Sequence, residues 1–132
     1  MRDPAAKRLP DPVTVGSERR GGGEEGPSRF EATDATFRSV VLESELPVLV
    51  DFWAPWCAPC RLVAPVVAEL GRELADRLRI ATLDIDENVA VATEHQVFST
   101  PTLVLFKGGR EVERVIGFKR KADLVIRLSR HL

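Results

Sequence analysis

The chain has 132 residues, of which 44% are hydrophobic and 30% are charged, as expected for one globular domain with a modest core. Its 19 basic and 20 acidic residues leave a net charge of −1, which gives no electrostatic reason to expect a nucleic acid or an anionic membrane as partner. No apolar run approaches the roughly 18 residues of a membrane-spanning helix, and the first 29 residues contain no continuous apolar stretch typical of a secretory signal. We therefore expect a cytoplasmic protein, and we expect it to be a monomer.

The first 28 residues differ in composition from the rest of the chain. They hold four prolines, the run Gly21-Gly22-Gly23 and five charges of each sign. Their apolar residues are too few and too scattered to offset the entropy of ordering this segment. We predict a disordered tail over residues 1–28, followed by a single domain over residues 29–132.

Helical and strand-like patterns alternate after this tail. Thr33 can cap a helix over about residues 34–44, which Pro47 ends. The nearly continuous apolar run over residues 48–53 predicts a strand buried on both faces, and a helix over about residues 57–75 follows it.

The second half of the chain predicts three more strands and two more helices. A tight hairpin turn over residues 107–110 joins the last two strands. The strands are expected over residues 78–85, 102–106 and 112–116, and the helices over 88–95 and 121–132. This order predicts an α/β fold with a mixed central β-sheet and helices on both faces, because strands joined by helices are parallel and a hairpin is antiparallel.

Two cysteines, Cys57 and Cys60, lie where the helix after the first strand begins. Residues i and i+3 of a helix are about 5–6 Å apart, and a disulfide needs a similar separation between its α-carbons. The spacing therefore allows both the dithiol and the disulfide with little backbone movement. Cys57 is predicted to attack, because the helix N-terminus favours a thiolate. Cys60, a turn further in and less exposed, is predicted to resolve the mixed disulfide.

A cysteine pair at this spacing can also bind a metal or serve a purely structural role. Zinc binds cysteines three residues apart, but structural zinc normally has four ligands, and the histidines His95 and His131 are far apart in the sequence. We therefore expect no metal. A purely structural buried pair is disfavoured because the flanking Trp and Pro residues indicate an exposed loop end.

Asp51 is a carboxylate inside the apolar run over residues 48–53. Poor solvation there raises its pKa and makes it a proton acceptor near neutral pH. It lies at the C-terminal end of a strand that leads into the redox loop, so we expect it to take the proton of Cys60, directly or through water. The alternative is an edge aspartate that faces solvent.

Several separated motifs give the chain a resemblance to the thioredoxin family. They are the run VDFWAPWCAPC, Pro65 in the following helix, the segment STPTLVLFKGG, and Gly117. They occur in the order and spacing of that family from about Phe30 to Leu132. Motifs in register are far more specific than a CxxC alone.

The resemblance implies a thioredoxin fold and further site residues. Pro101 matches the family's cis-proline, which faces the disulfide and pairs with an incoming substrate backbone. Trp53 and Trp56 match the two tryptophans beside the active site, and core packing is at least as important for Trp53. Pro65 matches a helix-kinking proline. The residues expected at a shallow substrate-docking face are Trp56, Ala58, Pro59, Ser99, Thr100 and Gly117.

The implied function is that of a protein-disulfide reductase acting on disulfide-containing proteins. A flavin-containing thioredoxin reductase with NADPH would recycle it, and the redox-active Cys57–Cys60 disulfide would need no further cofactor. An oxidant or isomerase would need an exported location. The alternative from another class is a binding or chaperone module with incidental cysteines, against which the intact dithiol, Asp51 and Pro101 speak.

The sequence departs from the family pattern at three positions. Ala58 replaces the usual glycine of the active-site loop, which should stiffen it. Thr82 stands where many members carry a lysine beside the buried aspartate, so Asp51 is expected to be more easily protonated here. Phe118 follows Gly117 where a small residue is common, which changes the docking face. These departures affect quantitative behaviour rather than the class of protein.

Overall fold

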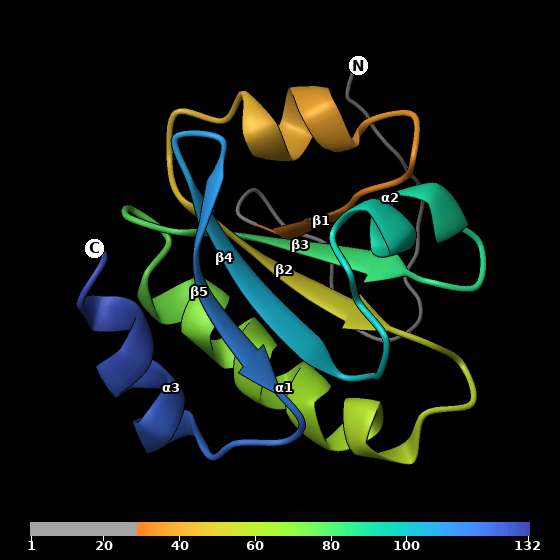
Figure 1. Cartoon of the computed structure of the whole chain (residues 1–132). Helices are drawn as coiled ribbons and strands as arrows, with labels where there is room; N and C mark the ends of the chain where they lie inside the picture. Colours follow the sequence, from red (N-terminus) through yellow and green to blue (C-terminus); the bar gives the residue numbers. More distant parts are fainter. Residues whose placement is uncertain (1–28) are drawn as a thin grey trace.

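The computed structural model describes residues 29–132, so the prediction made for residues 1–28 lies outside the described residues. The strands form one five-stranded sheet in the order β1-β3-β2-β4-β5 (Figure 1). In chain order the elements are β1 (Arg29–Glu31), η1 (Arg38–Leu42), β2 (Val48–Trp53), α1 (Ala58–Glu73), β3 (Arg79–Asp84), α2 (Val89–Glu94), β4 (Thr102–Lys107), β5 (Arg110–Ile116) and α3 (Lys121–Ser129).

The sheet is mixed, as predicted. Strand β3 pairs in parallel with both β1 and β2, whereas β4 pairs antiparallel with β2 and with β5. The crossover through α1 accounts for the parallel pair β2–β3, and the hairpin accounts for the antiparallel pair β4–β5. The short edge strand β1 was not predicted.

Helices cover both faces of the sheet. Alternate residues of the central strand β2 point to opposite faces, and since nearly all of them are apolar, both faces must be shielded from water. Figure 1 shows α1 and α3 on one face, with η1 and α2 on the other. Val48, Val50 and Phe52 belong to the cluster with η1 and α2, whereas Leu49 belongs to the cluster with α1 and α3. Each fully buried aliphatic or aromatic side chain contributes about 1.5–3 kcal/mol relative to exposure. The core residues that the helices and the η1 N-cap contribute are Phe37, Val41, Val91, Val63, Val67, Leu70, Leu124 and Leu128.

The first helix is shorter than predicted and is a π-helix rather than an α-helix. Thr33 does not cap η1, whose N-cap is Phe37, without a side-chain bond. The Thr33 Oγ1 instead accepts the backbone N–H of Thr36 at 3.2 Å in the turn that precedes the helix. The last turn is of the π type, with the N–H of Glu43 donating to the carbonyl of Arg38 at 2.9 Å. The helix ends at Leu42, so the prediction that Pro47 ends it was wrong. Ser44 follows it, and its hydroxyl donates to a nearby backbone carbonyl and so favours a turn.

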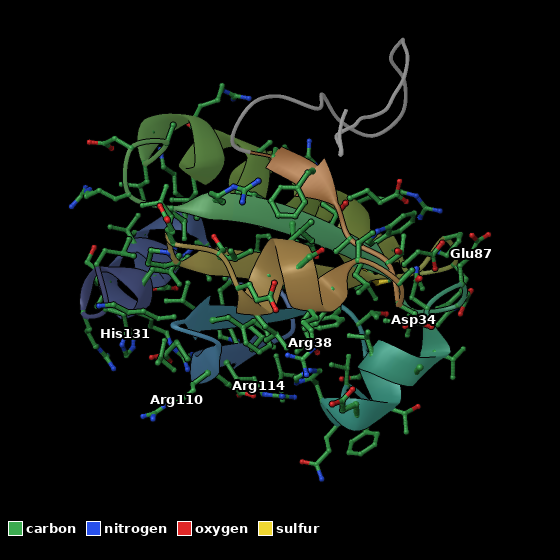
Figure 2. The ribbon with its side chains drawn as sticks, turned by 90° about the horizontal axis from the view of Figure 1, so that it is seen from above. Asp34, Arg38, Glu87, Arg110, Arg114 and His131 are labelled. Atoms are coloured by element: carbon green, nitrogen blue, oxygen red, sulfur yellow. A yellow bond between two sulfur atoms is a disulfide. The ribbon has the colours of Figure 1, made fainter. Side chains whose placement is uncertain are left out.

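The short helix α2 is held at both ends by residues distant in the sequence (Figure 2). At its N-terminus the Asp34 carboxylate accepts the backbone N–H of Val91 at 2.9 Å and that of Ala90 at 3.3 Å. At its C-terminus the Arg114 guanidinium donates to the backbone carbonyls of His95 at 2.7 Å and Gln96 at 3.1 Å. These bonds fix the segment that leads into β4.

The β4–β5 hairpin turns on two glycines, as the sequence predicted. Gly108 and Gly109 have φ values of +63° and +80°, a conformation that two-residue hairpin turns require and that a β-carbon disfavours. The other predicted helices and strands agree with the structure to within three residues at each end.

Replacing Gly109 by alanine should lower the free energy of unfolding more than replacing Gly108. Both changes carry a backbone cost of about 1–2 kcal/mol at positive φ. Only the β-carbon at Gly109 would meet a neighbour, the carbonyl oxygen of Leu42 at 3.0 Å, whereas nothing lies within 4 Å at Gly108. Urea denaturation of both variants measures the difference, and equal losses would contradict the contact with Leu42.

Candidate active site

The two cysteines flank the first turn of α1. Strand β2 ends at Trp53, and Cys57 is the N-cap of α1, where its sulfur accepts the backbone N–H of Cys60 at 3.2 Å. The two side chains form a disulfide, and their α-carbons are 5.4 Å apart, within the predicted range. Ala58 and Pro59 occupy the first two helical positions, where the missing N–H of proline leaves no bond unmade.

The expectation that Cys60 is the less exposed cysteine was wrong. In the disulfide form Cys57 is 3% exposed and Cys60 is 5% exposed. The reason is that both pack with Ala54 in one small cluster, against which Trp53 and Ile85 lie. What distinguishes the two sulfurs is their position: Cys57 caps the helix, where free N–H groups favour a thiolate, and Cys60 lies inside it.

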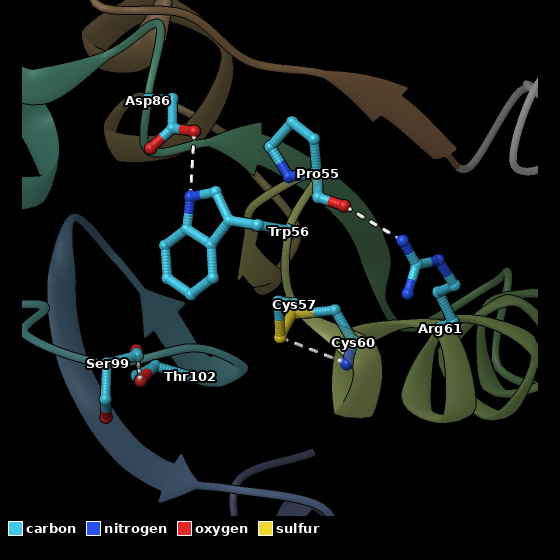
Figure 3. The surroundings of a disulfide bond; sticks show 8 residues. All are labelled: Pro55, Trp56, Cys57, Cys60, Arg61, Asp86, Ser99 and Thr102. Carbon is cyan, nitrogen blue, oxygen red and sulfur yellow. Dashed lines mark hydrogen bonds between the residues drawn. A yellow bond between two sulfur atoms is a disulfide. The ribbon is translucent and has the colours of Figure 1, made fainter.

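The loop before Cys57 is held from two sides (Figure 3). The indole Nε1 of Trp56 donates to Oδ2 of Asp86 at 2.9 Å, although the residue is 65% exposed. On the other side the Arg61 guanidinium donates to the carbonyl of Pro55 at 3.0 Å. The exposed indole is therefore fixed in orientation beside the disulfide.

Pro101 lies at the same edge of the sheet as the disulfide loop. The Thr100–Pro101 peptide bond is cis, in agreement with the resemblance. Thr102 pairs with Phe52, so β4 begins beside the point where β2 ends. The Pro101 carbonyl accepts the N–H of Gly117 at 2.8 Å, which brings the end of β5 to the same place.

The predicted docking residues are accessible to different degrees. Ser99 is exposed, and its carbonyl accepts the Thr102 hydroxyl at 2.7 Å; Figure 3 draws both residues in the surroundings of the disulfide. Thr100 and Gly117 are half-buried, and Gly117 has a φ of +87°. The other three, Trp56, Ala58 and Pro59, are exposed on the loop and the first turn of α1. Four of the six therefore lie on loops, and Ala58 and Pro59 lie in the first turn of α1.

Asp51 is buried in β2, so the alternative of a solvent-facing aspartate is wrong. It is 3% exposed, pairs with Thr82 on one side and Leu103 on the other, and its Oδ1 has no hydrogen-bond partner. Burial raises its pKa from 3.8 to about 7, and the positive charge of Arg29 acts in the opposite direction. The carboxyl lies two residues before the end of the strand rather than at it.

Two predicted structural residues occupy supporting positions. Trp53 is half-buried and packs against the cluster that contains both cysteines. Pro65 lies inside α1 and has no N–H to donate, so the carbonyl of Arg61 loses its helical partner. The kink expected at Pro65 stays a prediction.

Four residues near the site were not found from the sequence. Asp86 follows β3, and because β2 and β3 are parallel their C-terminal ends meet at one edge, a signal that could have revealed it. Phe98 is 85% exposed just before the Pro101 loop. No sequence pattern distinguishes Arg61 or Arg29 from the other arginines of the chain. Among residues 29–132 no helix is long and apolar enough to cross a membrane, and no cluster of three or more side chains suited to a metal occurs there.

Comparisons with known proteins agree with this geometry. Residues 28–130 match the family model described as Thioredoxin. Thioredoxin 1 of Synechococcus elongatus is 50% identical over 100 residues, which cover 76% of this chain and 94% of that protein. The M-type chloroplastic thioredoxin of Chlamydomonas reinhardtii is 50% identical over 99 residues, 75% of this chain and 71% of that protein. A bifunctional thioredoxin reductase/thioredoxin of Mycobacterium leprae is 52% identical over 100 residues, 76% of this chain and 22% of that protein.

The disulfide across the first turn of α1, at the same end of a mixed sheet as Pro101, is the centre of a thiol–disulfide oxidoreductase. The matched model covers nearly all of the described residues, and the relatives are about half identical. The chain belongs to the thioredoxin family. The predicted family, fold class and protein-disulfide reductase activity are thereby confirmed.

Replacing Asp86 by alanine should release the Trp56 indole, because its hydrogen bond to the carboxylate is lost. The cost in stability should be small, about 1 kcal/mol, since the pair is solvent-exposed. The indole N–H resonance of Trp56 should move upfield in the proton–nitrogen correlation spectrum while that of Trp53 stays in place. Glu87→Ala removes an equal charge from the same loop and is the control; an equal shift in that variant would contradict the assigned bond.

Proposed function

We propose that Cys57 attacks the substrate disulfide and Cys60 resolves the intermediate. The observation that carries this assignment is the position of Cys57 as the N-cap of α1. The Cys57 thiolate bonds to one substrate sulfur and the other substrate sulfur leaves as a thiolate. Deprotonated Cys60 then bonds to the Cys57 sulfur, the second substrate sulfur leaves, and the disulfide seen in the structure remains. The substrate gains two electrons and the dithiol loses them.

Asp51 would accept the proton of Cys60 during the second step. Two observations support this role: the carboxyl is buried on the strand that leads into the loop, and burial raises its pKa to about 7. A base works best when its pKa lies near the working pH. At neutral pH about half of the Asp51 side chains would therefore be ready to accept a proton.

The substrate would lie against the end of the sheet where the loops of Trp56 and Pro101 meet. Support comes from the exposed indole held by Asp86 and from the cis-proline beside the end of β2. An extended substrate segment can bond to backbone groups of such an edge without any demand on its side chains. The large exposed side chains near this edge, Phe98 and Phe118, would favour substrates with apolar residues around the disulfide.

The electron donor would be a thioredoxin reductase that uses NADPH, as family membership implies. A relative that joins a thioredoxin reductase and a thioredoxin in one chain supports this partner. The sulfur atoms carry the electrons, so we propose no further cofactor. We place the activity, as a monomer, in a reducing compartment such as the cytoplasm, because a chain with only two cysteines has no framework of structural disulfides. A binding or chaperone role with an incidental dithiol has no support.

The two cysteine variants should fail in different ways. Cys57→Ser should abolish reduction of insulin disulfides, because the remaining sulfur, that of Cys60, lies inside α1 and is not placed to attack. Cys60→Ser should still attack but should stop as a covalent mixed disulfide, which non-reducing electrophoresis and mass spectrometry detect. The reverse pattern, with covalent adducts only in Cys57→Ser, would show that Cys60 is the nucleophile.

Asp51→Asn should stabilise the fold, and the gain should depend on pH. In the folded chain Asp51 keeps its proton up to about pH 7, whereas the unfolded chain loses it near 3.8. The folded state thus binds more protons between these values, so wild-type stability falls as pH rises through this window. The pKa difference sets an upper limit of roughly 4 kcal/mol on the gain at pH 8.

Urea denaturation of wild type and Asp51→Asn at pH 4 and pH 8 measures this gain. It should be small at pH 4 and should reach its full value at pH 8. Asp76→Asn is the control, because Asp76 is exposed, and its effect should be small at both values. A gain for Asp51→Asn that is equal at pH 4 and pH 8 would contradict the burial of an ionisable Asp51.

A further inference from the structure

The edge strand β1 places a cation on the same face of the sheet as Asp51. Arg29 pairs with Ile80 of β3, and Ile80 pairs with Leu49 of β2. Ile80 and Leu49 both belong to the core cluster under α1 and α3. Phe30, the next residue of β1, packs against the opposite cluster. Because side chains alternate along a strand, Arg29 and Asp51 lie on the face that α1 covers.

The Arg29 side chain is partly withdrawn from solvent. The residue is half-buried, and its Nε atom is buried. Charges interact more strongly at a site removed from water, because the local dielectric constant is lower. The positive charge of Arg29 accordingly lowers the pKa of Asp51, which lies on the same face of the sheet.

We propose that Arg29 is a positioning residue that favours the ionised form of Asp51 and so keeps this carboxyl available as the acceptor of the Cys60 proton. This inference rests on the role proposed for Asp51 in resolution. The proposal gives the edge strand β1 a function in addition to its pairing with β3.

The surroundings of Asp51 support the assignment to Arg29. Its strand neighbours Thr82 and Leu103 carry no charge. The buried residues of α1 and α3, the helices on this face, include no basic or acidic side chain. The sulfurs of Cys57 and Cys60, at the start of α1, are joined in the disulfide form and do not titrate. Of the described residues, Arg29 is the one whose charge lowers the Asp51 pKa.

Other charges near the sheet do not fill this role. Glu31 and Asp84 lie on the same face by alternation, but they are acidic and would disfavour a second carboxylate. Arg79 is basic, but it lies on the opposite face, with its guanidinium 4.3 Å from the centre of the Phe30 ring. Arg79 therefore provides a matched control.

The test is the titration of the Asp51 carboxyl carbon by NMR in the oxidised protein, where the cysteines do not titrate. Arg29→Gln should raise the midpoint by about 0.5–1 pH unit, less than the 1–3 units typical of a contacting pair. Arg29→Lys should keep the midpoint close to that of wild type, because the charge is retained. Arg79→Gln should leave it unchanged.

Two outcomes would overturn the proposal. One is a midpoint that Arg29→Gln does not move, and the other is an equal shift in Arg79→Gln, which would reveal a general charge effect. If Arg29→Gln does not fold, Arg29→Met takes its place, because methionine keeps an unbranched apolar stem without the charge. A rise of about 0.5 pH unit or more in the Asp51 midpoint then supports the proposal, and an unmoved midpoint overturns it. The titration involves no turnover, so its failure leaves the roles of Cys57 and Cys60 to be judged by the trapping experiment.

Discussion

The pairing of β2 with a neighbour on each side is the constraint on which the rest of the structure depends. Its backbone bonds to β3 in parallel and to β4 in antiparallel, and its alternate side chains enter both core clusters. Because β2 runs parallel to β3 and opposite to β4, its C-terminal end meets the end of one and the beginning of the other. The loops that contain the disulfide, Asp86 and Pro101 therefore converge at one end of the sheet.

This convergence explains how a small domain can present a reactive disulfide on a rigid base. The loop before Cys57 follows directly from a buried strand, and bonds to Asp86 and Arg61 fix it from two sides. The Pro101 loop is tied to β5 through Gly117 and is preceded by α2, which Asp34 and Arg114 hold at its ends. Reacting groups held by such elements lose little entropy when a substrate binds.

One residue of this central strand, Asp51, lowers the stability of the fold. Asp51 stands in a core where an apolar residue would be more stable, and one of its oxygens has no partner. An ionisable group in such a place is expensive when charged, and for that reason its pKa lies near neutrality. If Asp51 accepts the Cys60 proton as proposed, stability is given up at the position of the proton acceptor. The charge of Arg29, at the edge of the sheet, acts against the rise of the Asp51 pKa.

Much of this arrangement could be predicted from the sequence, because its signals are local. The apolar run around Asp51 predicted both a buried strand and a raised pKa, and the glycine pair predicted the hairpin. The three-residue strand β1 has two charged residues out of three and no hydrophobic period to detect. The positions of Arg29 and Asp86 relative to the site depend on strand order, and the near-equal burial of the two cysteines depends on packing. Neither can be deduced from residues that are neighbours in the sequence.

The rate at which Cys60 resolves the mixed disulfide tests the central claim most directly. It can be followed in a single turnover across the range from mildly acidic to mildly basic pH in wild type and in Asp51→Asn. If Asp51 accepts the proton, the wild-type rate should rise with pH around a midpoint near the Asp51 pKa of about 7, and the variant should be slower at neutral pH without that midpoint. Identical pH profiles in the two proteins would contradict the account.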